Sequence, residues 1–320
     1  MIDKKHMRVV FMGTPEFAIP TLEGLIESGV RIVGVFTQPD RPKGRGRKLE
    51  ASPVKQLAQE HDLPVFQPQK LRDKDAVRQV RELKPELIVV VAYGQILPEE
   101  VLDIPRYGCI NVHASLLPRH RGASPINKAL MEGDPMTGVT TMCMDVGLDT
   151  GDMLVKKSLS IFPNENAGEL HGRLAHLGRD AMEETLARLC AGTLSPQKQD
   201  DSRSSYAPML KKEDGLIDWS RPAASIHNQV RGLYPWPGAF TCLDGEVLKI
   251  ADTRIVDTDG TPGEIIKTED SGVVIACGDG ALQVRKLQLP GKKMLPAADF
   301  LRGVKLQRGQ KLGQAQPTVH

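Results

Sequence analysis

Hydrophobic residues follow two periods along the N-terminal part of the chain. The β-branched run from Arg8 to Met12 predicts a strand, and apolar residues then recur at helical intervals from Pro15 to Ser28. The strand pattern returns at residues 30–37, 64–67, 87–91, 108–113, 139–144 and 153–161. Leu87–Val91 is apolar throughout, as is typical of a strand buried on both faces. Alternating strands and helices favour an α/β fold with a doubly wound, mostly parallel sheet.

The hydrophobic pattern changes in the C-terminal part. A long helix is predicted from Asn166 to near Gly192, with Glu169 as the capping-box partner of Asn166. Residues 193–208 are polar without a regular period, which is typical of a linker. Beyond them one helix at 223–233 precedes short β segments that turn signals separate, which favours a small antiparallel barrel or sandwich. These segments are 239–243, 247–251, 272–276 and 282–289. We therefore expect two domains, residues 1–192 and 209–320, joined by residues 193–208.

Composition excludes several protein classes. The 320 residues carry a formal net charge of only +2, so affinity for a polyanion would depend on where the cations lie. The five cysteines are widely spaced and form no Cys-Xaa-Xaa-Cys pair, which argues against a disulfide framework and a thiolate metal cage. Because neither a signal peptide nor a long apolar stretch is apparent, we expect a cytoplasmic protein without a membrane span.

An amide, an imidazole and a carboxylate occur where the sheet should end. Asn111 and His113 lie two residues apart at a strand end, so both project from one face, and the loop from Gly147 to Asp152 adds Asp149 and Asp152. Acyl transfer to an amine needs a donor for the oxyanion, a group that moves protons and an anion that fixes its tautomer. The simpler interpretation is a half-exposed polar strand and an ordinary turn aspartate.

Three other chemistries are disfavoured. Ser115 lacks the Gly-Xaa-Ser-Xaa-Gly elbow of serine hydrolases. Gly13 stands alone where a dinucleotide site would have three glycines, which weakens a nicotinamide-dependent oxidoreductase. The histidines show no metal-ligand spacing with acidic neighbours, so we expect no metal.

Cations cluster at two places. Arg41, Lys43, Arg45, Arg47 and Lys48 are interleaved with glycines after the second strand. Such a run is usually a solvated loop, but at the ligand edge of a sheet it favours contact with phosphates. A second cluster near the C-terminus contains Lys292, Lys293, Arg302, Lys305, Arg308 and Lys311. Two basic patches on different domains suggest one extended polyanion.

Six segments in order along both domains resemble the methionyl-tRNA formyltransferases. They are FMGTPEFA, TQPDRPKGRG, VVVAYGQILP, INVHASLLPRHRGASPI, MDVGLDTGDML and IDWSRPAASIHNQVRGLYPWPGAFT. The Asn-Xaa-His with a downstream Asp is similar to the wider 10-formyltetrahydrofolate-dependent formyltransferases, and the basic loop with the second domain narrows the resemblance to the tRNA enzymes. His120 departs from the family, which often has a bulkier aromatic ring there.

The resemblance implies a Rossmann-like formyltransferase domain followed by an OB-like β-barrel domain that helps to hold tRNA. It implies that Asn111, His113 and Asp149 are catalytic, and that the basic loop, especially Arg45, contacts the acceptor end of initiator methionyl-tRNA. The residues expected around 10-formyltetrahydrofolate are Tyr93, Gly94, Gln95, Ile96, Ser115, Leu116, Leu117 and Pro118. We expect a monomer.

The mechanism implied by the resemblance has three parts. The uncharged methionine amine attacks the formyl carbon, Asn111 and His113 stabilise the oxyanion, and Asp149 orients or charges His113 while a proton moves toward N10. The rival of the same architecture is a formyltransferase for an amino sugar or a glycinamide nucleotide. A non-catalytic RNA-binding protein is the rival of a different class, but it leaves the three polar residues without a purpose.

Overall fold

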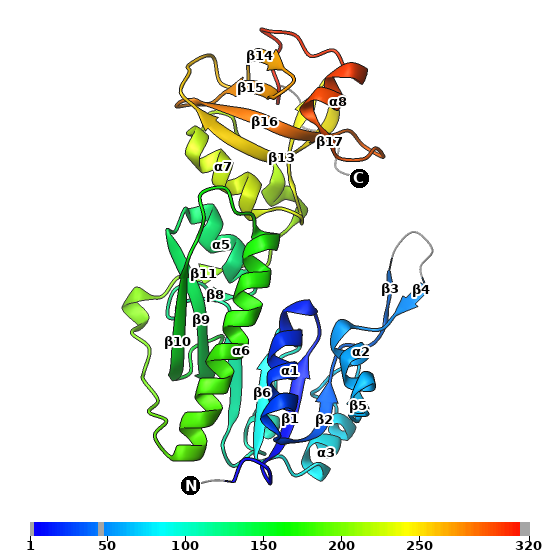
Figure 1. Cartoon of the computed structure of the whole chain (residues 1–320), viewed down its shortest axis with the longest axis vertical. Coiled ribbons are helices and arrows are strands. Elements are labelled where there is room, and N and C mark those ends of the chain that lie inside the picture. Colours follow the sequence, from blue (N-terminus) through cyan, green and yellow to red (C-terminus); the bar gives the residue numbers. More distant parts are fainter. Residues whose placement is uncertain (1–2, 44–47, 314–320) are drawn as a thin grey trace. The chain divides into compact units, whose positions relative to one another are not determined.

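The computed structural model describes residues 3–43 and 48–313, which form two compact units (Figure 1). Unit 1 comprises Met1–Gly122, Thr137–Leu159 and His171–Ala207. Unit 2 comprises Ala123–Met136, Ser160–Leu170 and Pro208–His320. Both units are discontinuous in sequence, whereas the hydrophobic pattern predicts two contiguous domains.

A seven-stranded sheet forms the centre of unit 1, in the order β10-β9-β7-β6-β1-β2-β5. The strands are β1 (Arg8–Gly13), β2 (Arg31–Phe36), β5 (Val65–Phe66), β6 (Leu87–Val91), β7 (Cys109–His113), β9 (Met136–Cys143) and β10 (Met153–Ser160). The pairs from β5 through β2, β1 and β6 to β7 are parallel, and β7 pairs with β9 in the antiparallel direction. The predicted doubly wound, mostly parallel sheet is therefore confirmed. Strand order reverses between β1 and β6, where such sheets bind ligands.

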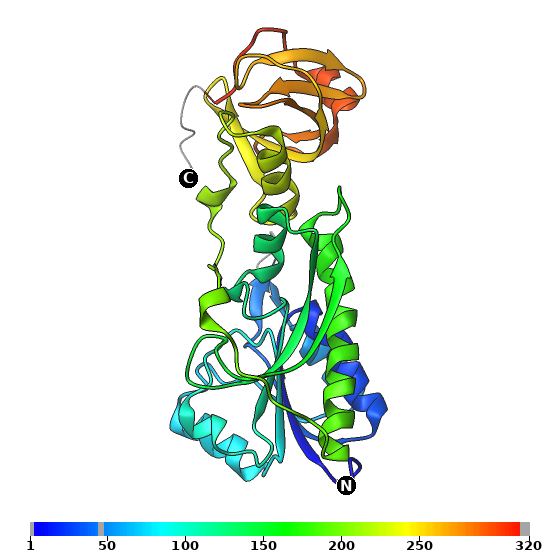
Figure 2. The same cartoon turned by 90° about the vertical axis from the view of Figure 1, so that its left-hand side faces the viewer.

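Helices cover both faces of this sheet (Figure 2). The helices are α1 (Ile19–Ser28), α2 (Pro53–Glu60), α3 (Lys74–Glu82), α4 (Glu99–Leu102) and α6 (Ala167–Ala191). α1 and α6 lie on one face, while α3 and α4 lie on the other, where Val77 and Val101 share a core with Ile88. The predicted helix at 15–28 begins with a separate 3₁₀ turn, Glu16–Ala18, before α1.

The long helix α6 begins as the sequence predicts. The backbone amide of Asn166 donates to Glu169 Oε2, and the amide of Glu169 donates to Asn166 Oδ1, both at 3.0 Å. These reciprocal bonds satisfy two of the free donors at the helix start. The predicted capping box is therefore confirmed.

Residues 193–207 are more ordered than the predicted linker. They contain the 3₁₀ turn Asp201–Arg203 and β11 (Tyr206–Ala207), which pairs in parallel with β8 (Arg121–Gly122). Gln197 forms an isolated bridge with Met153 at the start of β10. This polar segment therefore forms its backbone hydrogen bonds with residues that lie far away in the sequence.

Unit 2 contains an antiparallel sheet in the order β12-β13-β16-β15-β14, with β17 paired to β16. The strands are β12 (Ala239–Leu243), β13 (Glu246–Val256), β14 (Ile265–Glu269), β15 (Gly272–Ala276), β16 (Ala281–Gln288) and β17 (Leu295–Pro296). Its helices are α5 (Pro125–Glu132), α7 (Ala223–Gly232) and α8 (Ala297–Gly303), with a 3₁₀ turn at Lys212–Gly215. Antiparallel strands agree with the prediction, while closure into an OB-like barrel stays a prediction.

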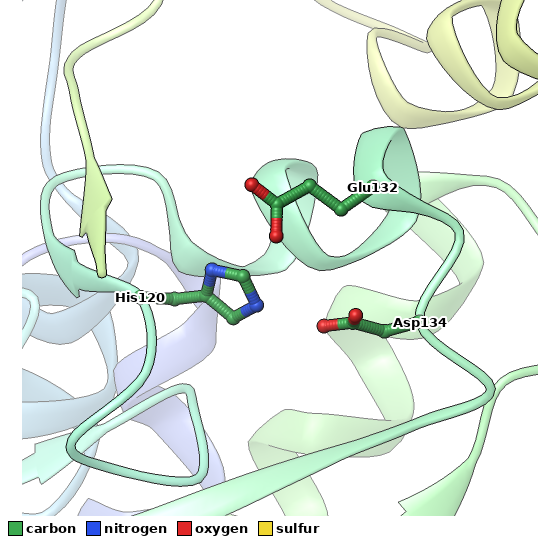
Figure 3. A group of neighbouring side chains, drawn as sticks. All are labelled: His120, Glu132 and Asp134. Carbon is green, nitrogen blue, oxygen red and sulfur yellow. The ribbon is translucent and has the colours of Figure 1, made fainter. Parts of the chain in front are cut away.

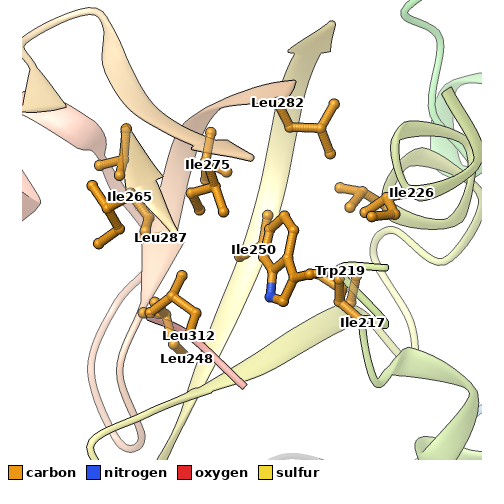
Figure 4. Close-up of a cluster of buried hydrophobic side chains, with 14 of the residues drawn as sticks. Ile217, Trp219, Ile226, Leu248, Ile250, Ile265, Ile275, Leu282, Leu287 and Leu312 are labelled. Atoms are coloured by element: carbon orange, nitrogen blue, oxygen red, sulfur yellow. The ribbon is translucent and has the colours of Figure 1, made fainter. Parts of the chain in front are cut away.

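The core of unit 2 lies between α7 and this sheet (Figure 4). Ile226 of α7 packs with strand residues such as Ile250 and Leu282, all of them at most 2% exposed. Trp219 joins this core, and its indole nitrogen donates to the buried Thr241 hydroxyl at 3.0 Å. Burial of the only polar atom of Trp219 is thereby compensated.

Across residues 3–43 and 48–313, no helix combines the length and apolar character that a membrane crossing requires.

Candidate active site

Strand β7 presents Asn111 and His113 at its carboxyl end, on the face away from α6. Gly178 of α6 approaches the intervening Val112 so closely that an added Cβ would lie 3.0 Å from Val112 Cγ1. Because side chains alternate along a strand, Asn111 and His113 point to the opposite face. Ile110 and Val112 are buried, while Asn111 is half-buried.

Asp149 meets both residues across a long sequence separation. Its Oδ1 lies 3.5 Å from Asn111 Nδ2, and its Oδ2 lies 3.6 Å from His113 Nδ1. Asp152, the other predicted carboxylate, lies immediately before β10, where its carbonyl accepts from the Cys143 amide at 2.8 Å. The three residues that the family resemblance assigns therefore form one cluster.

The backbone of unit 1 fixes the Asp149 carboxylate. The Gly122 amide donates to Asp149 Oδ2 at 2.8 Å, while Asp149 itself has a φ of 54°. Gly122 has a φ of 115°, and a Cβ there would lie 2.6 Å from the Ala207 carbonyl oxygen. Only glycine fits this position without displacing the donor, so the local conformation of Gly122 holds the carboxylate in place.

The hydrogen bonds of His113 indicate its tautomer. His113 Nε2 lies 2.9 Å from the carbonyl oxygen of His120. Since a carbonyl can only accept, Nε2 carries the hydrogen of the neutral ring, and Nδ1 faces Asp149 with a lone pair. A proton gained by this ring would lie between Nδ1 and the Asp149 carboxylate.

His120 lies at the end of the segment that follows β7 (Figure 3). It has a φ of 57°, and its amide donates to Ser205 Oγ at 2.9 Å. Figure 3 also labels Glu132 and Asp134 around the end of α5. Glu132 and Asp134 belong to unit 2, whereas His120 belongs to unit 1.

The segment from Ser115 to Pro118 is held by its own polar groups. Ser115 Oγ donates to the Arg119 carbonyl at 2.6 Å, and the Thr140 hydroxyl donates to the Ser115 carbonyl at 2.7 Å. Ser115 and Leu117 are buried, whereas Leu116 and Pro118 are half-buried. The Ser115 hydroxyl therefore shapes the turn, and only Leu116 and Pro118 keep partly exposed side chains for a ligand.

The segment from Tyr93 to Ile96 follows β6 at the switch point of the sheet. The Tyr93 side chain is buried in the core beside α4, and this burial raises the pKa of its hydroxyl. Gln95 Oε1 accepts from the Leu71 amide at 2.6 Å, so its side chain holds a neighbouring loop. Ile96 is 91% exposed and Gly94 is exposed with a φ of 82°. A ligand here would meet Ile96 and exposed backbone.

Two further residues contact this segment: Thr14, in a loop whose position after the first predicted strand marks it as a candidate, and Gln38, which was missed in the sequence. The Thr14 hydroxyl and Gln38 Nε2 both donate to the Tyr93 carbonyl, at 2.9 and 3.2 Å. They follow β1 and β2 at the ligand edge of the sheet, and a position directly after a predicted strand is the feature of the sequence that marks both as candidate site residues. Lys156 Nζ donates to the Leu117 carbonyl at 2.6 Å, a contact without a signal in the sequence.

The described part of the basic loop is a two-stranded ribbon. β3 (Arg41–Lys43) pairs with β4 (Lys48–Glu50) in the antiparallel direction. Arg45 and Arg47 lie outside the described residues. The base of the ribbon is tied down because Asp40 accepts from Lys55 at 2.6 Å, and this hydrogen bond lowers the pKa of the Asp40 carboxyl.

Two family models match the chain. The model described as "Formyl transferase" matches residues 7–186. The model described as "Formyl transferase, C-terminal domain" matches residues 209–305. Together they cover most of both predicted domains.

Solved structures share the fold at lower identity. An N-formyltransferase of Helicobacter canadensis, solved with folinic acid and dTDP-3-aminofucose, has a TM-score of 0.67 at 19% identity and covers 87% of this chain and 98% of its own. HypX of Aquifex aeolicus, solved with tetrahydrofolic acid, has a TM-score of 0.65 at 18% identity and covers 97% of this chain and 51% of its own.

Curated relatives match nearly the whole chain. A methionyl-tRNA formyltransferase of Geobacter sulfurreducens is 56% identical over 314 residues, 98% of this chain and 99% of the relative. A methionyl-tRNA formyltransferase of Ruminiclostridium cellulolyticum is 48% identical over 312 residues, 96% of this chain and 100% of the relative. The chain therefore belongs to the methionyl-tRNA formyltransferase family.

Proposed function

We propose that this chain transfers the formyl group of 10-formyltetrahydrofolate to the α-amino group of methionine on initiator methionyl-tRNA. A bond forms between the amine nitrogen and the formyl carbon, the bond from that carbon to N10 breaks, and one proton moves from the amine to N10. The observation that carries the proposal is the convergence of Asn111, His113 and Asp149 at the ligand edge of the sheet, with separations of 3.5 and 3.6 Å.

Asn111 is the proposed donor to the tetrahedral oxyanion. Its Nδ2 carries two hydrogens, and the 3.5 Å separation from Asp149 leaves at most a weak interaction to give up. His113 Nε2 is already bonded to the His120 carbonyl, so Nδ1 is the ring atom available for proton transfer. We therefore propose separate roles, with oxyanion stabilisation on Asn111 and proton movement on His113, whereas the family resemblance implies that both residues stabilise the oxyanion.

Asp149 is proposed to stabilise the protonated His113. The attacking nitrogen becomes cationic as its bond to carbon forms, and its proton must leave before N10 departs as an amine. His113 Nδ1 can take this proton while Asp149 Oδ2 compensates the positive charge from 3.6 Å. His113 is only 6% exposed, so little water competes with the carboxylate.

We propose that the folate lies along the half-buried Leu116 and Pro118 and the exposed Ile96, with backbone groups at Gly94. The buried side chains of Tyr93, Ser115 and Leu117 and the bonded amide of Gln95 then hold these segments in shape. The structure of HypX with bound tetrahydrofolic acid and the similarity to methionyl-tRNA formyltransferases support this donor class.

The tRNA is proposed to contact the second domain and the basic loop that contains β3 and β4. The cations of this loop are Arg41, Lys43, Arg45, Arg47 and Lys48. Cations on an exposed ribbon release counterions from phosphates when RNA binds. We further propose that the protein acts in the cytoplasm as a monomer, with domains bounded at 1–192 and 209–320.

The decisive experiment offers the protein 10-formyltetrahydrofolate with methionylated initiator tRNA, methionylated elongator tRNA or a free amino-sugar nucleotide. Formylation of the initiator tRNA with far slower reaction of the other two substrates supports the proposal. Equal rates on free amines would refute it in favour of a small-molecule formyltransferase. Raising salt should weaken tRNA binding steeply and leave the rate on bound tRNA nearly constant.

A further inference from the structure

The side chain of Gln199 bridges the two carbonyl groups that flank Thr150. Its Nε2 donates to the Asp149 carbonyl and to the Gly151 carbonyl, both at 2.8 Å. Gln199 lies in the polar segment after α6, and its side chain uses both amide hydrogens on the Asp149 loop. Both distances are those of well-formed hydrogen bonds.

Arg121 fixes the orientation of this amide. Arg121 Nε and Nη2 donate to Gln199 Oε1 at 3.0 and 2.8 Å, and Nη2 also donates to Asp201 at 2.7 Å. A flipped Gln199 would turn its amide hydrogens toward the guanidinium and its oxygen toward two carbonyls. Since guanidinium groups only donate and carbonyls only accept, one orientation satisfies all partners. The Arg121 side chain is only 12% exposed, so this arrangement is shielded from solvent.

The bridged loop carries the residue that faces His113. Asp149 has a φ of 54°, a conformation that residues other than glycine rarely adopt, so its backbone needs external support. Gln199 provides this support at the Asp149 carbonyl, and the Gly122 amide supports the Asp149 carboxylate at 2.8 Å. Arg121, which orients Gln199, and Gly122, which donates to the Asp149 carboxylate, are adjacent residues of the short strand β8.

We propose that Gln199, oriented by Arg121, is a positioning residue that holds the Asp149 carboxylate against His113. This inference rests on the formyl transfer proposed above, in which Asp149 compensates the charge of His113. The segment after α6 then belongs functionally to the active site, through side-chain bonds to the backbone of a distant loop. In metal sites, removal of the outer hydrogen bonds that orient the ligands typically costs about 10- to 100-fold in activity, and we expect a loss of similar size here.

The test compares Gln199→Leu with Gln197→Leu. Gln199→Leu removes both bonds to the Asp149 loop, and we expect kcat to fall about 10- to 100-fold with KM for either substrate within about threefold. Gln197 lies two residues away, and its backbone bridges Met153, so its side chain offers a matched control with a wild-type rate expected. Gln199→Glu keeps the shape of the side chain, and it replaces Gln199→Leu in this comparison if the leucine variant does not fold.

A second variant distinguishes positioning from a general structural effect. In an Asp149→Asn background, Gln199→Leu should lower kcat by less than about threefold, because the charge that it positions is already gone. A wild-type kcat in both Gln199 variants, or a full loss in the Asp149→Asn background, would overturn the inference. If the unaltered protein formylates no methionyl-tRNA, the proposed function fails instead, so the two failures are separate.

Discussion

Replacing Asp149 by Asn tests the charge at the centre of the proposed site with little change in shape. The amide has one acceptor oxygen, and the 2.8 Å bond from the Gly122 amide requires it, because the opposite orientation would set two donors against each other. Its NH₂ group then takes the place of Oδ1 and cannot accept from Asn111 Nδ2, so the weak 3.5 Å contact between these two side chains is also lost. The loop conformation is retained, and the negative charge facing His113 is lost.

The magnitude follows from the separation of the two groups. At 3.6 Å and an effective dielectric constant of about 20, opposite unit charges attract by about 4.6 kcal/mol. If this attraction is gained only when His113 becomes protonated, its loss raises the barrier by up to that amount. Each 1.4 kcal/mol corresponds to about a factor of ten. We therefore expect Asp149→Asn to lower the single-turnover rate by about 100- to 1,000-fold.

The assay uses excess enzyme with saturating 10-formyltetrahydrofolate and methionylated initiator tRNA, and it follows the formylated product after quenching. Asp152→Asn is the matched control, because it removes a carboxylate from the same glycine-flanked loop while its carbonyl keeps the bond to Cys143. We expect this control to stay within about threefold of wild type. A mild effect of Asp149→Asn, or an equal effect of both substitutions, would refute the charge-compensation role.

Three further predictions concern the site and the fold. Asn111→Ala should lower the single-turnover rate about 100- to 1,000-fold with tRNA affinity unchanged, and a near-normal rate would exclude Asn111 as the oxyanion donor. Thr241→Val leaves the buried Trp219 indole N–H without its acceptor, so urea titration should give a free energy of unfolding lower by about 1–3 kcal/mol, whereas an unchanged midpoint would contradict this account. Burial lowers the pKa of His227 in the folded protein, so below about pH 6.5 the unfolded chain binds a proton that the folded chain does not. Stability should thus fall as pH drops from about 6.5 through the lowered pKa, and less steeply in His227→Gln, while identical slopes would argue against His227.

The features that the sequence predicted well are those with local causes. Leu87–Val91 is predicted as a buried strand and forms β6 with the same bounds, because five consecutive apolar residues fit no other common element of that length. The capping box of α6 depends on two residues three positions apart. The shared face of Asn111 and His113 follows from strand alternation alone.

The features that escaped prediction depend on distant partners. β3 contains a proline and β4 carries charges at both ends, so neither has the pattern of a strand. They form strands because they pair with each other. β14 was missed because it has only two aliphatic residues, Ile265 and Ile266, before its polar end. Gln95 and Ser115 lie in the segments expected to bind folate, yet their side chains bond to Leu71 and Arg119. Sequence position indicates where a strand ends, but tertiary partners decide where the next side chains point.

The polar segment at 193–208 shows why composition alone misleads near an active site. Loops at the ligand edge of a sheet leave backbone carbonyls without strand partners, and buried carbonyls need donors. Gln199 supplies two such bonds and Lys156 supplies another to Leu117, each from outside the loop it serves. A polar segment after a catalytic domain therefore has two interpretations. It is either a solvated linker or a segment whose side chains donate hydrogen bonds to the irregular loops of the site. A substitution scan of residues 193–208 separates them, since a connection tolerates change evenly, whereas donors concentrate the loss of activity at residues such as Gln199.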